Sequence, residues 1–338
     1  ASECPSNVDV AALKAEFLYQ YQKEHGVSFR TRLFADNVKY NKLGSLMPSV
    51  TNLVLNTNAA KRLIGVAVER SIPKLAQTTT RKWYQKNKAR FAPHESAKRQ
   101  VYLFLDEFTN FYDDTIGKDC IEVLSKLGYQ VIITDHEESG RSFISKGLLD
   151  EAKQLANQNI DFFKDKIHRD APLVGIEPSA LLTFRDEYLR LADDKNAAKE
   201  IAACAYTIEE FIEKEIKKGH IRENQFTLKT RNIKVHGHCQ QKSLSNMKAT
   251  FSMLSLTKNY QVSIMNTGCC GMAGSFGYEK EHYELSMQVG EDTLFPKIRN
   301  YGRDIEIIAS GTSCRHQIMD GTKRKAKHPI SLFKEALK

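Results

Sequence analysis

The same series of short segments occurs twice along the sequence, and this internal repeat limits the folds that the chain can adopt. The tripeptide Tyr-Gln-Val at residues 129–131 recurs 131 residues later, at residues 260–262. A further pair of segments, residues 172–179 and 306–313, matches at an offset of 134. Each copy alternates apolar, strand-like segments with amphipathic helical ones, which predicts α/β layering with mostly parallel sheets. The chain is therefore predicted to form two pseudo-symmetric Rossmann-like halves.

The first hundred residues lie outside the repeat and are predicted to be mostly helical. Apolar side chains recur at helical spacing in the stretch that Gly26 ends, and residues 52–70 form a second apolar segment. The basic stretch at residues 81–99 contains Pro93 and is predicted to be a connector. Residues 1–100 should therefore form a helical segment and a connector that precede the two halves.

The repeat divides the rest of the chain into a first half at residues 101–220 and a second half at residues 221–338. A highly charged stretch between the two copies, residues 186–225, has a pattern that predicts a bridging pair of helices. Cys120 and Cys204 lie among apolar residues. We predict that both pack in the core as small apolar side chains.

Composition is ordinary for a globular protein, with 41% hydrophobic and 27% charged residues in a chain of 338. There is no run of about 18 apolar residues and no secretory signal pattern, so we expect neither a membrane span nor export. Seven cysteines at scattered spacings favour a reducing compartment, and hence a cytoplasmic location. The net charge of +9 is spread along the chain, which favours a solvated surface over an anionic partner such as nucleic acid.

Four cysteines follow the predicted strands of the second half. Cys239 follows the first strand, Cys269 and Cys270 follow the second, and Cys314 follows the third. Open α/β sheets bind ligands at the carboxyl ends of their strands, so we expect these cysteines to lie close together. Thiolates are ligands for zinc and for iron–sulfur centres, and a metal or cluster site is the favoured hypothesis. Core packing of the four cysteines, or a disulfide such as Cys239 to Cys314, stays open as an alternative.

Glycines surround the adjacent cysteine pair, at positions 268, 271, 274 and 277. They allow a sharp backbone turn that brings both sulfur atoms to one centre and directs N–H groups toward negative charge. A helix is expected from about Tyr278, and its positive N-terminal end would lower the pKa of the thiols. Arg315, next to Cys314, could act in the same way.

Two histidines beside the cysteines are candidates for additional or alternative ligands. His238 precedes Cys239, and His316 follows Cys314 by two positions. Either could ligate a metal or hydrogen-bond a thiolate. His236 lies on the same alternating face as His238, and an ordinary strand or surface histidine is the favoured interpretation for any one of them.

The first half lacks the four cysteines at the matching positions. The residues there are Glu107, Glu138, Ser139 and Ala180. We predict that the first half kept the fold and lost the site. The alternative is a different polar site formed by Glu107, His136, Glu137 and Glu138.

Three motifs of the second half resemble a known family. VHGHC, GCCGMAGSFGYEKEHYELSM and GTSCRHQI resemble the cysteine-rich CCG domain found in heterodisulfide reductase and its relatives. They look most like the C-terminal region of large FAD-linked oxidases of the glycolate and D-lactate dehydrogenase kind, over about residues 100–338. The resemblance implies a [4Fe–4S] cluster, or zinc, held by four ligands. These would be Cys239, Cys269, Cys270 and Cys314.

The sequence departs from the family pattern at two places. Glu138 and Ser139 replace a first cysteine pair, and Ala180 replaces a further cysteine. The second motif of many members ends in two cysteines three residues apart, whereas here Gly311 takes the place of one and only Cys314 remains. A cluster with ligands from both halves is therefore not expected, and a single four-cysteine centre is.

The resemblance also implies partners. Cys4, followed by Pro5, is similar to the end of a bacterial ferredoxin cysteine run, which suggests a piece of a longer polypeptide. The expected function is an electron-transfer module of a multi-domain FAD-linked 2-hydroxy acid dehydrogenase, with FAD only in a separate flavin-binding domain. Its partners would be the flavin-binding and ferredoxin-like domains and a quinone or protein acceptor, with peripheral contact to the inner face of the membrane. The alternative is a non-catalytic interaction domain with structural zinc.

Overall fold

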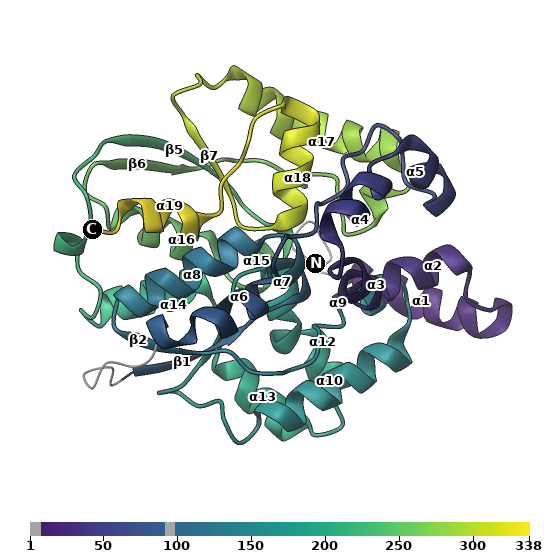
Figure 1. The fold of residues 1–338 in the computed structure, drawn as a ribbon, viewed down its shortest axis with the longest axis horizontal. Coiled ribbons are helices and arrows are strands. Elements are labelled where there is room, and N and C mark those ends of the chain that lie inside the picture. The colour runs from purple at the N-terminus through teal and green to yellow at the C-terminus, as the bar shows by residue number, and fades with distance from the viewer. Residues whose placement is uncertain (1–7, 92–98) are drawn as a thin grey trace.

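The computed structural model describes residues 8–91 and 99–338 and shows an α/β fold built on two parallel sheets (Figure 1). The first sheet has the strand order β2-β1-β3-β4 and the second has the order β6-β5-β7. Every neighbouring pair of these strands is parallel, which confirms the predicted fold class. The strands are β1 (Arg99–Phe104), β2 (Tyr129–Ile132), β3 (Leu173–Gly175), β4 (Ala205–Thr207), β5 (Arg231–His236), β6 (Tyr260–Ile264) and β7 (Glu306–Ala309).

Helices precede the sheets and cover them. The N-terminal segment holds α1 (Val10–His25), α2 (Phe29–Ala35), α3 (Asn37–Gly44), α4 (Pro48–Leu55), α5 (Asn58–Ile64), α6 (Thr80–Asn87) and the 3-10 helix η1 (Lys88–Phe91). The first half and the stretch after it hold α7 (Glu107–Phe111), α8 (Asp114–Lys126), α9 (Arg141–Ser145), α10 (Leu149–Phe163), α11 (Pro178–Leu181), η2 (Leu182–Arg185), α12 (Glu187–Leu191), α13 (Lys195–Ala203), α14 (Ile208–Lys217) and η3 (Glu223–Gln225). The second half holds α15 (Cys239–Leu244), α16 (Met247–Ser255), η4 (Phe276–Tyr278), α17 (Tyr283–Asn300), α18 (Thr312–Thr322) and α19 (Pro329–Ala336).

The repeat is visible in the pairing of the strands. In each half the first strand lies in the middle, with the second strand on one side and the third on the other. Arg99 of β1 pairs with Tyr129, whereas Arg231 of β5 pairs with Tyr260, so the first strands match at an offset of 132 rather than 131. With this correction Glu107, the first residue of α7, corresponds to Cys239, the first residue of α15.

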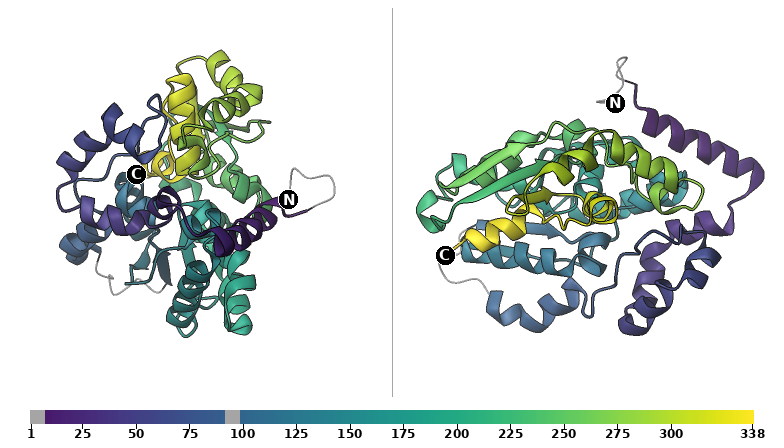
Figure 2. Two further views of the ribbon diagram at one scale, coloured as in Figure 1. Left: turned by 90° about the vertical axis from the view of Figure 1, so that its right-hand side faces the viewer. Right: turned by 90° about the horizontal axis from the view of Figure 1, so that it is seen from above.

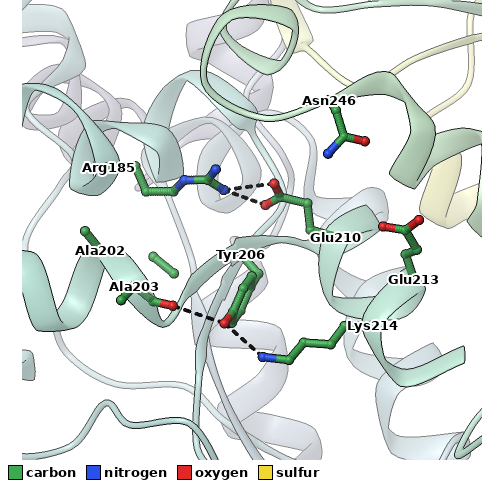
Figure 3. A pocket seen from close by; sticks show the side chains of 9 residues that line it. Arg185, Ala202, Ala203, Tyr206, Glu210, Glu213, Lys214 and Asn246 are labelled. Carbon is green, nitrogen blue, oxygen red and sulfur yellow. Dashed lines mark hydrogen bonds and ion pairs between the residues drawn. The ribbon is translucent and has the colours of Figure 1, made fainter. Parts of the chain in front are cut away.

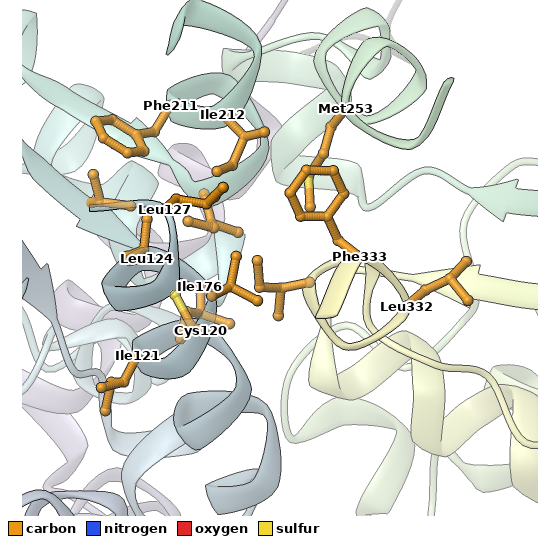
Figure 4. Close-up of a cluster of buried hydrophobic side chains, with 14 of the residues drawn as sticks. Cys120, Ile121, Leu124, Leu127, Ile176, Phe211, Ile212, Met253, Leu332 and Phe333 are labelled. Atoms are coloured by element: carbon orange, nitrogen blue, oxygen red, sulfur yellow. The ribbon is translucent and has the colours of Figure 1, made fainter. Parts of the chain in front are cut away.

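The two halves share one hydrophobic core. Figure 4 shows Phe333 of α19 and Met253 of α16 in the same cluster as Leu124 and Cys120 of α8. Cys120 is fully buried there, and Cys204 is buried in a neighbouring cluster, as predicted for both. Because apolar side chains of both halves fill one core, the division into separate halves stays a prediction.

Helices α1 to α5 gather at one end of the molecule, whereas α6 lies apart from them beside α8 (Figure 1 and Figure 2). The expected connector is partly wrong, because residues 80–87 form α6: Thr79 caps its first turn by accepting a hydrogen bond from the backbone N–H of Lys82. Two residues of the sequence analysis lie outside the described residues: Pro93, and Cys4, which resembles the end of a ferredoxin cysteine run.

None of the helices in the described ranges is long and apolar enough to cross a bilayer.

The charged stretch between the two copies contains a strand that the sequence pattern did not predict. The stretch was expected to hold a pair of helices and holds three, α12, α13 and α14. Strand β4 lies between α13 and α14 and adds a fourth strand to the first sheet. Thr207 ends this strand and at once caps α14 through a reciprocal pair of hydrogen bonds with Glu210. With three residues, β4 is too short to produce a detectable alternation of apolar and polar positions.

Candidate metal centre

The candidate centre lies at the carboxyl ends of the three strands of the second sheet. His236 is the last residue of β5, and Cys239 is the first residue of α15 just beyond it. Cys269 and Cys270 lie in the loop after β6, and Cys314 lies in the first turn of α18, after β7. The fold therefore brings together side chains that are far apart in the sequence, at the edge where open α/β sheets bind ligands.

Three of these side chains form a buried inner group. One ligand atom each of His236, Cys270 and Cys314 lies within 4.8 Å of the other two. His236 is fully buried, and both cysteines are at most 4% exposed. His236 was not among the predicted ligands, because one histidine in an alternating strand carries little information. The only signal was its place three residues before Cys239, at the end of a strand.

Cys239 and Cys269 form an outer pair beside the inner group. Cys239 is exposed and Cys269 is half-buried. The sulfur atoms of Cys239 and Cys270 lie beside that of Cys269, and these contacts lower the pKa of Cys269 and raise the pKa values of Cys239 and Cys270. The backbone N–H of Gly271 adds a hydrogen bond of 3.3 Å to the Cys269 sulfur.

The inner and outer groups are continuous. Cys270 also contacts Cys314, and this contact, together with His236, lowers the pKa of the Cys314 thiol. All four predicted cysteines thus lie in one chain of sulfur contacts that runs from exposed Cys239 to buried Cys314. That they ligate a metal stays a prediction.

Gly271 makes the turn after the cysteine pair. Its φ of +90° is a left-handed conformation that side chains disfavour, and a Cβ atom there would lie 2.1 Å from the carbonyl oxygen of Ser286. Ser286 belongs to α17, which begins at Tyr283 and not near Tyr278 as expected. The cysteine loop therefore packs against the first turn of α17 with backbone touching backbone, and only glycine fits.

A buried arginine from the N-terminal segment holds this loop from the other side. The Nε of Arg70 donates to the carbonyl oxygen of Gly277 at 2.8 Å. One terminal nitrogen donates to Gln317 Oε1 at 2.6 Å and to Asp320 Oδ2 at 3.1 Å, both on α18. Arg70 is fully buried, so it fixes the loop and the Cys314 helix relative to each other. Its partners lie more than 200 residues away in the sequence, and no local pattern could identify them.

Carboxylates of the first half hold the start of α18. Glu177 Oε2 accepts a hydrogen bond of 2.8 Å from the backbone N–H of Thr312, and Asp113 accepts one of 2.5 Å from the Thr312 hydroxyl. Asp113 also pairs with Arg315 at 2.5 Å. Arg315, which we expected to act on the Cys314 thiol, is therefore committed to a carboxylate of the other half.

The two predicted histidines lie outside the inner group. His238 Nδ1 accepts a hydrogen bond of 3.2 Å from the backbone N–H of Gln240 and so caps α15, and its Nε2 lies 3.8 Å from Glu177 Oε1. His316 is half-buried, and burial lowers its pKa. Their role as ligands or as partners of a thiolate stays a prediction.

A cleft of about 460 Å³ lies at the matching edge of the first sheet. It brings together the residues of the alternative polar site, which are Glu107, His136, Glu137 and Glu138. Two of them are fully used inside the protein. The Nε2 of His136 accepts a hydrogen bond of 3.1 Å from the backbone N–H of Leu105, and its Nδ1 lies 2.7 Å from the carbonyl oxygen of Glu137. One ring nitrogen thus accepts and the other donates, which requires a neutral ring. Burial lowers the pKa of His136 to about 3, in keeping with this.

Glu107 in this cleft is bound to Ser139. Its two carboxylate oxygens accept from the backbone N–H and the hydroxyl of Ser139, at 3.0 and 2.5 Å. Glu138 keeps one buried carboxylate oxygen without a partner among the described residues, and burial, with the charge of Glu107, raises its pKa to about 8. Among the described residues, the side chains of this cleft do not form a group of donors close enough together to hold a metal. That they form a polar site of another kind stays a prediction.

A separate hollow of about 380 Å³ lies between α13, α14 and the loop before α16 (Figure 3). One terminal nitrogen of Arg185 donates to both carboxylate oxygens of Glu210 there, and Lys214 donates to the hydroxyl of Tyr206 at 2.9 Å. Glu213, which also lines it, pairs with Lys217 at 2.9 Å. The charged side chains of this hollow already have partners, so it does not compete with the cysteine site.

Comparison with known proteins relates the chain to dehydrogenases. It is 25% identical over 350 aligned residues to the D-2-hydroxyglutarate dehydrogenase of Pantoea ananatis, an alignment that covers 100% of this chain and 33% of that protein. It is 26% identical over 298 residues to a subunit of the anaerobic glycerol-3-phosphate dehydrogenase of Escherichia coli, an alignment that covers 85% of this chain and 72% of that protein. It is 25% identical over 237 residues to lactate utilization protein A of Bacillus subtilis, an alignment that covers 68% of this chain and 94% of that protein.

The chain thus spans about a third of the length of the D-2-hydroxyglutarate dehydrogenases that it matches. No family model and no solved structure matches it. The relatives named here are thus a dehydrogenase, a dehydrogenase subunit and a protein of lactate utilization, and each is at most 26% identical to this chain.

Proposed function

We propose that the chain is the iron–sulfur electron-transfer part of a dehydrogenase that oxidises a 2-hydroxy acid. The observation that carries this proposal is the convergence of four cysteine sulfurs on one pocket of the second half. Iron–sulfur clusters are held by cysteine thiolates, so the donor set fits such a group. Cys239, Cys269, Cys270 and Cys314 would hold it. When bound, the cluster would accept and release single electrons.

The protein around the site favours a rigid centre with one open edge. Gly271 and Arg70 fix the loop of Cys269 and Cys270, and carboxylates of the first half fix the helix of Cys314. Cys239 alone among the four is exposed, so it marks the edge from which electrons reach the solvent side or a partner. Such fixed surroundings limit the rearrangement of the protein when the charge of the centre changes.

A flavin-binding partner domain is part of the proposal. Fifteen of the twenty exposed large apolar side chains in the described ranges lie between Val8 and Leu63, in the N-terminal helices. Clusters of exposed apolar side chains are typical of interaction surfaces. The relatives include a dehydrogenase subunit and dehydrogenases about three times as long as this chain, which supports a larger assembly. The substrate would be bound and oxidised by that partner domain.

A structural zinc site is the second candidate. The buried inner group, with Cys269 as a fourth donor, would give a closed tetrahedral set of three sulfurs and one nitrogen. Closed sets of this kind are typical of structural zinc. In that case the chain would act as a non-catalytic interaction domain.

Anaerobic purification followed by metal analysis separates the two candidates. The proposal predicts about four iron atoms and about four inorganic sulfides per chain, with a broad visible absorption that bleaches on reduction. A colourless anaerobic protein that holds one zinc per chain, and takes up no iron when ferrous iron and sulfide are added, would refute the electron-transfer function.

A further inference from the structure

We propose that His236 is a metal ligand through its Nε2 atom, so that the centre has a mixed thiolate and imidazole ligand set. This inference deepens the proposed function and rests on a metal being bound at the cysteine pocket, where His236 would take the place of one of the four cysteines as a ligand. It does not depend on whether that metal is an iron–sulfur cluster or a single ion. The argument comes from the orientation of the ring, from its burial and from its distance to the two inner cysteines.

The orientation of the imidazole is fixed by Thr267. His236 Nδ1 lies 2.8 Å from the Thr267 hydroxyl oxygen. Thr267 is held in turn, because Lys242 of α15 donates to its carbonyl oxygen at 2.7 Å. Metal-binding histidines commonly donate the N–H of one ring nitrogen to an oxygen, which leaves the lone pair of the other nitrogen for the metal. Here that arrangement leaves Nε2 as the available donor.

Burial makes an unused Nε2 costly. His236 is fully buried, and its Nε2 has no hydrogen bond of normal geometry to any described residue. A buried polar atom without such a bond is rare in native proteins and destabilises the fold. One nitrogen of the ring lies within 4.8 Å of the Cys314 sulfur, so the imidazole stands beside a sulfur donor. His136 of the first half shows the contrast, because both of its ring nitrogens have backbone partners.

The distances fit coordination. A ligand atom of His236 lies within 4.8 Å of the sulfurs of Cys270 and Cys314, which also lie within 4.8 Å of each other. Two donors on one tetrahedral ion lie roughly 3.5–4 Å apart, given bond lengths of about 2.0–2.3 Å. Side-chain movements of less than about 1 Å would therefore close the three donors on one metal atom. His238 and His316 are not part of this group.

A neutral imidazole ligand has a redox consequence. Replacing an anionic thiolate by imidazole lowers the negative charge on an iron–sulfur centre and raises its reduction potential. A centre with His236 as a ligand should thus accept electrons more readily than an all-cysteine centre in the same pocket. His236→Cys should shift the midpoint potential downward.

Pulsed electron paramagnetic resonance of the full chain tests the inference. The chain is reconstituted anaerobically with ferrous iron and sulfide, reduced, and compared with His236→Cys, His236→Ala and the control His238→Ala. We expect a nitrogen coupling of a directly bound imidazole in the unmodified chain and in His238→Ala, and its loss in His236→Cys. An iron centre without this coupling, or a coupling that persists in His236→Cys, would overturn the assignment and leave the iron–sulfur function standing.

A second measurement covers the case in which no iron is taken up. The metal-free chain is loaded with Co²⁺, and X-ray absorption at the cobalt edge counts sulfur and nitrogen neighbours. Three sulfurs and one nitrogen in the unmodified chain, with four sulfurs in His236→Cys, would support His236 as a ligand while refuting the iron–sulfur function. Four sulfurs in the unmodified chain, or no cobalt bound, would overturn the inference itself.

Discussion

The two halves of the molecule share one strand order but differ in what lies at the carboxyl ends of their strands. In the first half Glu107 and Ser139 bind each other through two hydrogen bonds. In the second half the matching positions, Cys239 and Cys270, carry thiols that contact one another through Cys269, and the ring of His236 faces Cys314. The first edge thus pairs its polar groups with each other, whereas the second directs its donors at one centre.

The difference also assigns the first half a task. Its carboxylates Glu177 and Asp113 bind the first turn of α18 and so position Cys314. The two halves therefore differ in role: the second half supplies the cysteine and histidine donors, and the first half holds the helix that carries Cys314. Four predictions test this comparison, from the largest expected effect to the smallest.

Replacing the inner thiols should abolish metal binding, whereas the matched change in the first half should not. Cys270→Ser combined with Cys314→Ser removes both buried sulfurs of the inner group. We expect bound iron to fall to background, because a serine hydroxyl is a poor ligand for these metals. Ser139→Ala, at the position that matches Cys270, should retain the full metal content. Metal analysis of the anaerobically purified variants measures both, and equal losses in the two would contradict the comparison.

Removing the buried arginine should be the most damaging single change to stability. Arg70→Met deletes the hydrogen bonds by which this side chain joins the N-terminal segment to the cysteine loop and to α18, and it leaves Asp320 without this partner. We expect a loss of about 3–5 kcal/mol in the free energy of unfolding, since the Asp320 side chain, which is 9% exposed, loses its opposite charge and, among the described residues, keeps only its hydrogen bonds to Ser71. Denaturant unfolding measures the loss. A loss below about 1 kcal/mol would show that Arg70 does not fix the site.

The matched glycines Gly271 and Gly140 should respond differently to alanine. Both have positive φ, +90° and +70°. A Cβ at Gly271 would lie 2.1 Å from a backbone oxygen, whereas at Gly140 its nearest neighbour would be a Leu155 methyl group at 3.5 Å. Gly140→Ala should cost only the left-handed conformation, about 1–2 kcal/mol. Gly271→Ala should cost more, about 3 kcal/mol, because the loop must also move.

Denaturant unfolding and metal analysis of the two glycine variants measure how much stability and how much bound metal each variant loses. A larger loss for Gly140→Ala than for Gly271→Ala would contradict the packing described for the cysteine loop.

The smallest effect concerns pH. Glu138 matches Cys269, and burial raises its pKa to about 8, so the folded chain retains a proton that the unfolded chain loses near pH 4.5. The free energy of unfolding should therefore fall between about pH 4.5 and 8, and Glu138→Gln should remove part of that fall. Urea unfolding at pH 5 and pH 8 measures the difference between the two chains. If the free energy of unfolding depends on pH in the same way in both chains, Glu138 does not retain a proton in the folded chain and this prediction is wrong.

Much of the fold could be predicted because the repeat and the strand patterns are local signals. The four cysteines could be placed together for the same reason, since parallel strands end at one edge of a sheet. Arg70 could not be found, because its importance comes from contacts across the whole chain. His236 could not be separated from its neighbour His238 by spacing, since only the loop that carries Thr267 decides which ring faces the sulfurs.

The most direct test of the central claim is a crystal structure of the anaerobically purified chain, with diffraction data collected at the iron absorption edge. The account predicts one anomalous peak, or one compact group of peaks, within bonding distance of Cys270, Cys314 and His236, and none in the cleft of Glu107 and Glu138. Iron density elsewhere, or a cysteine pocket of iron-loaded protein without it, would contradict the account.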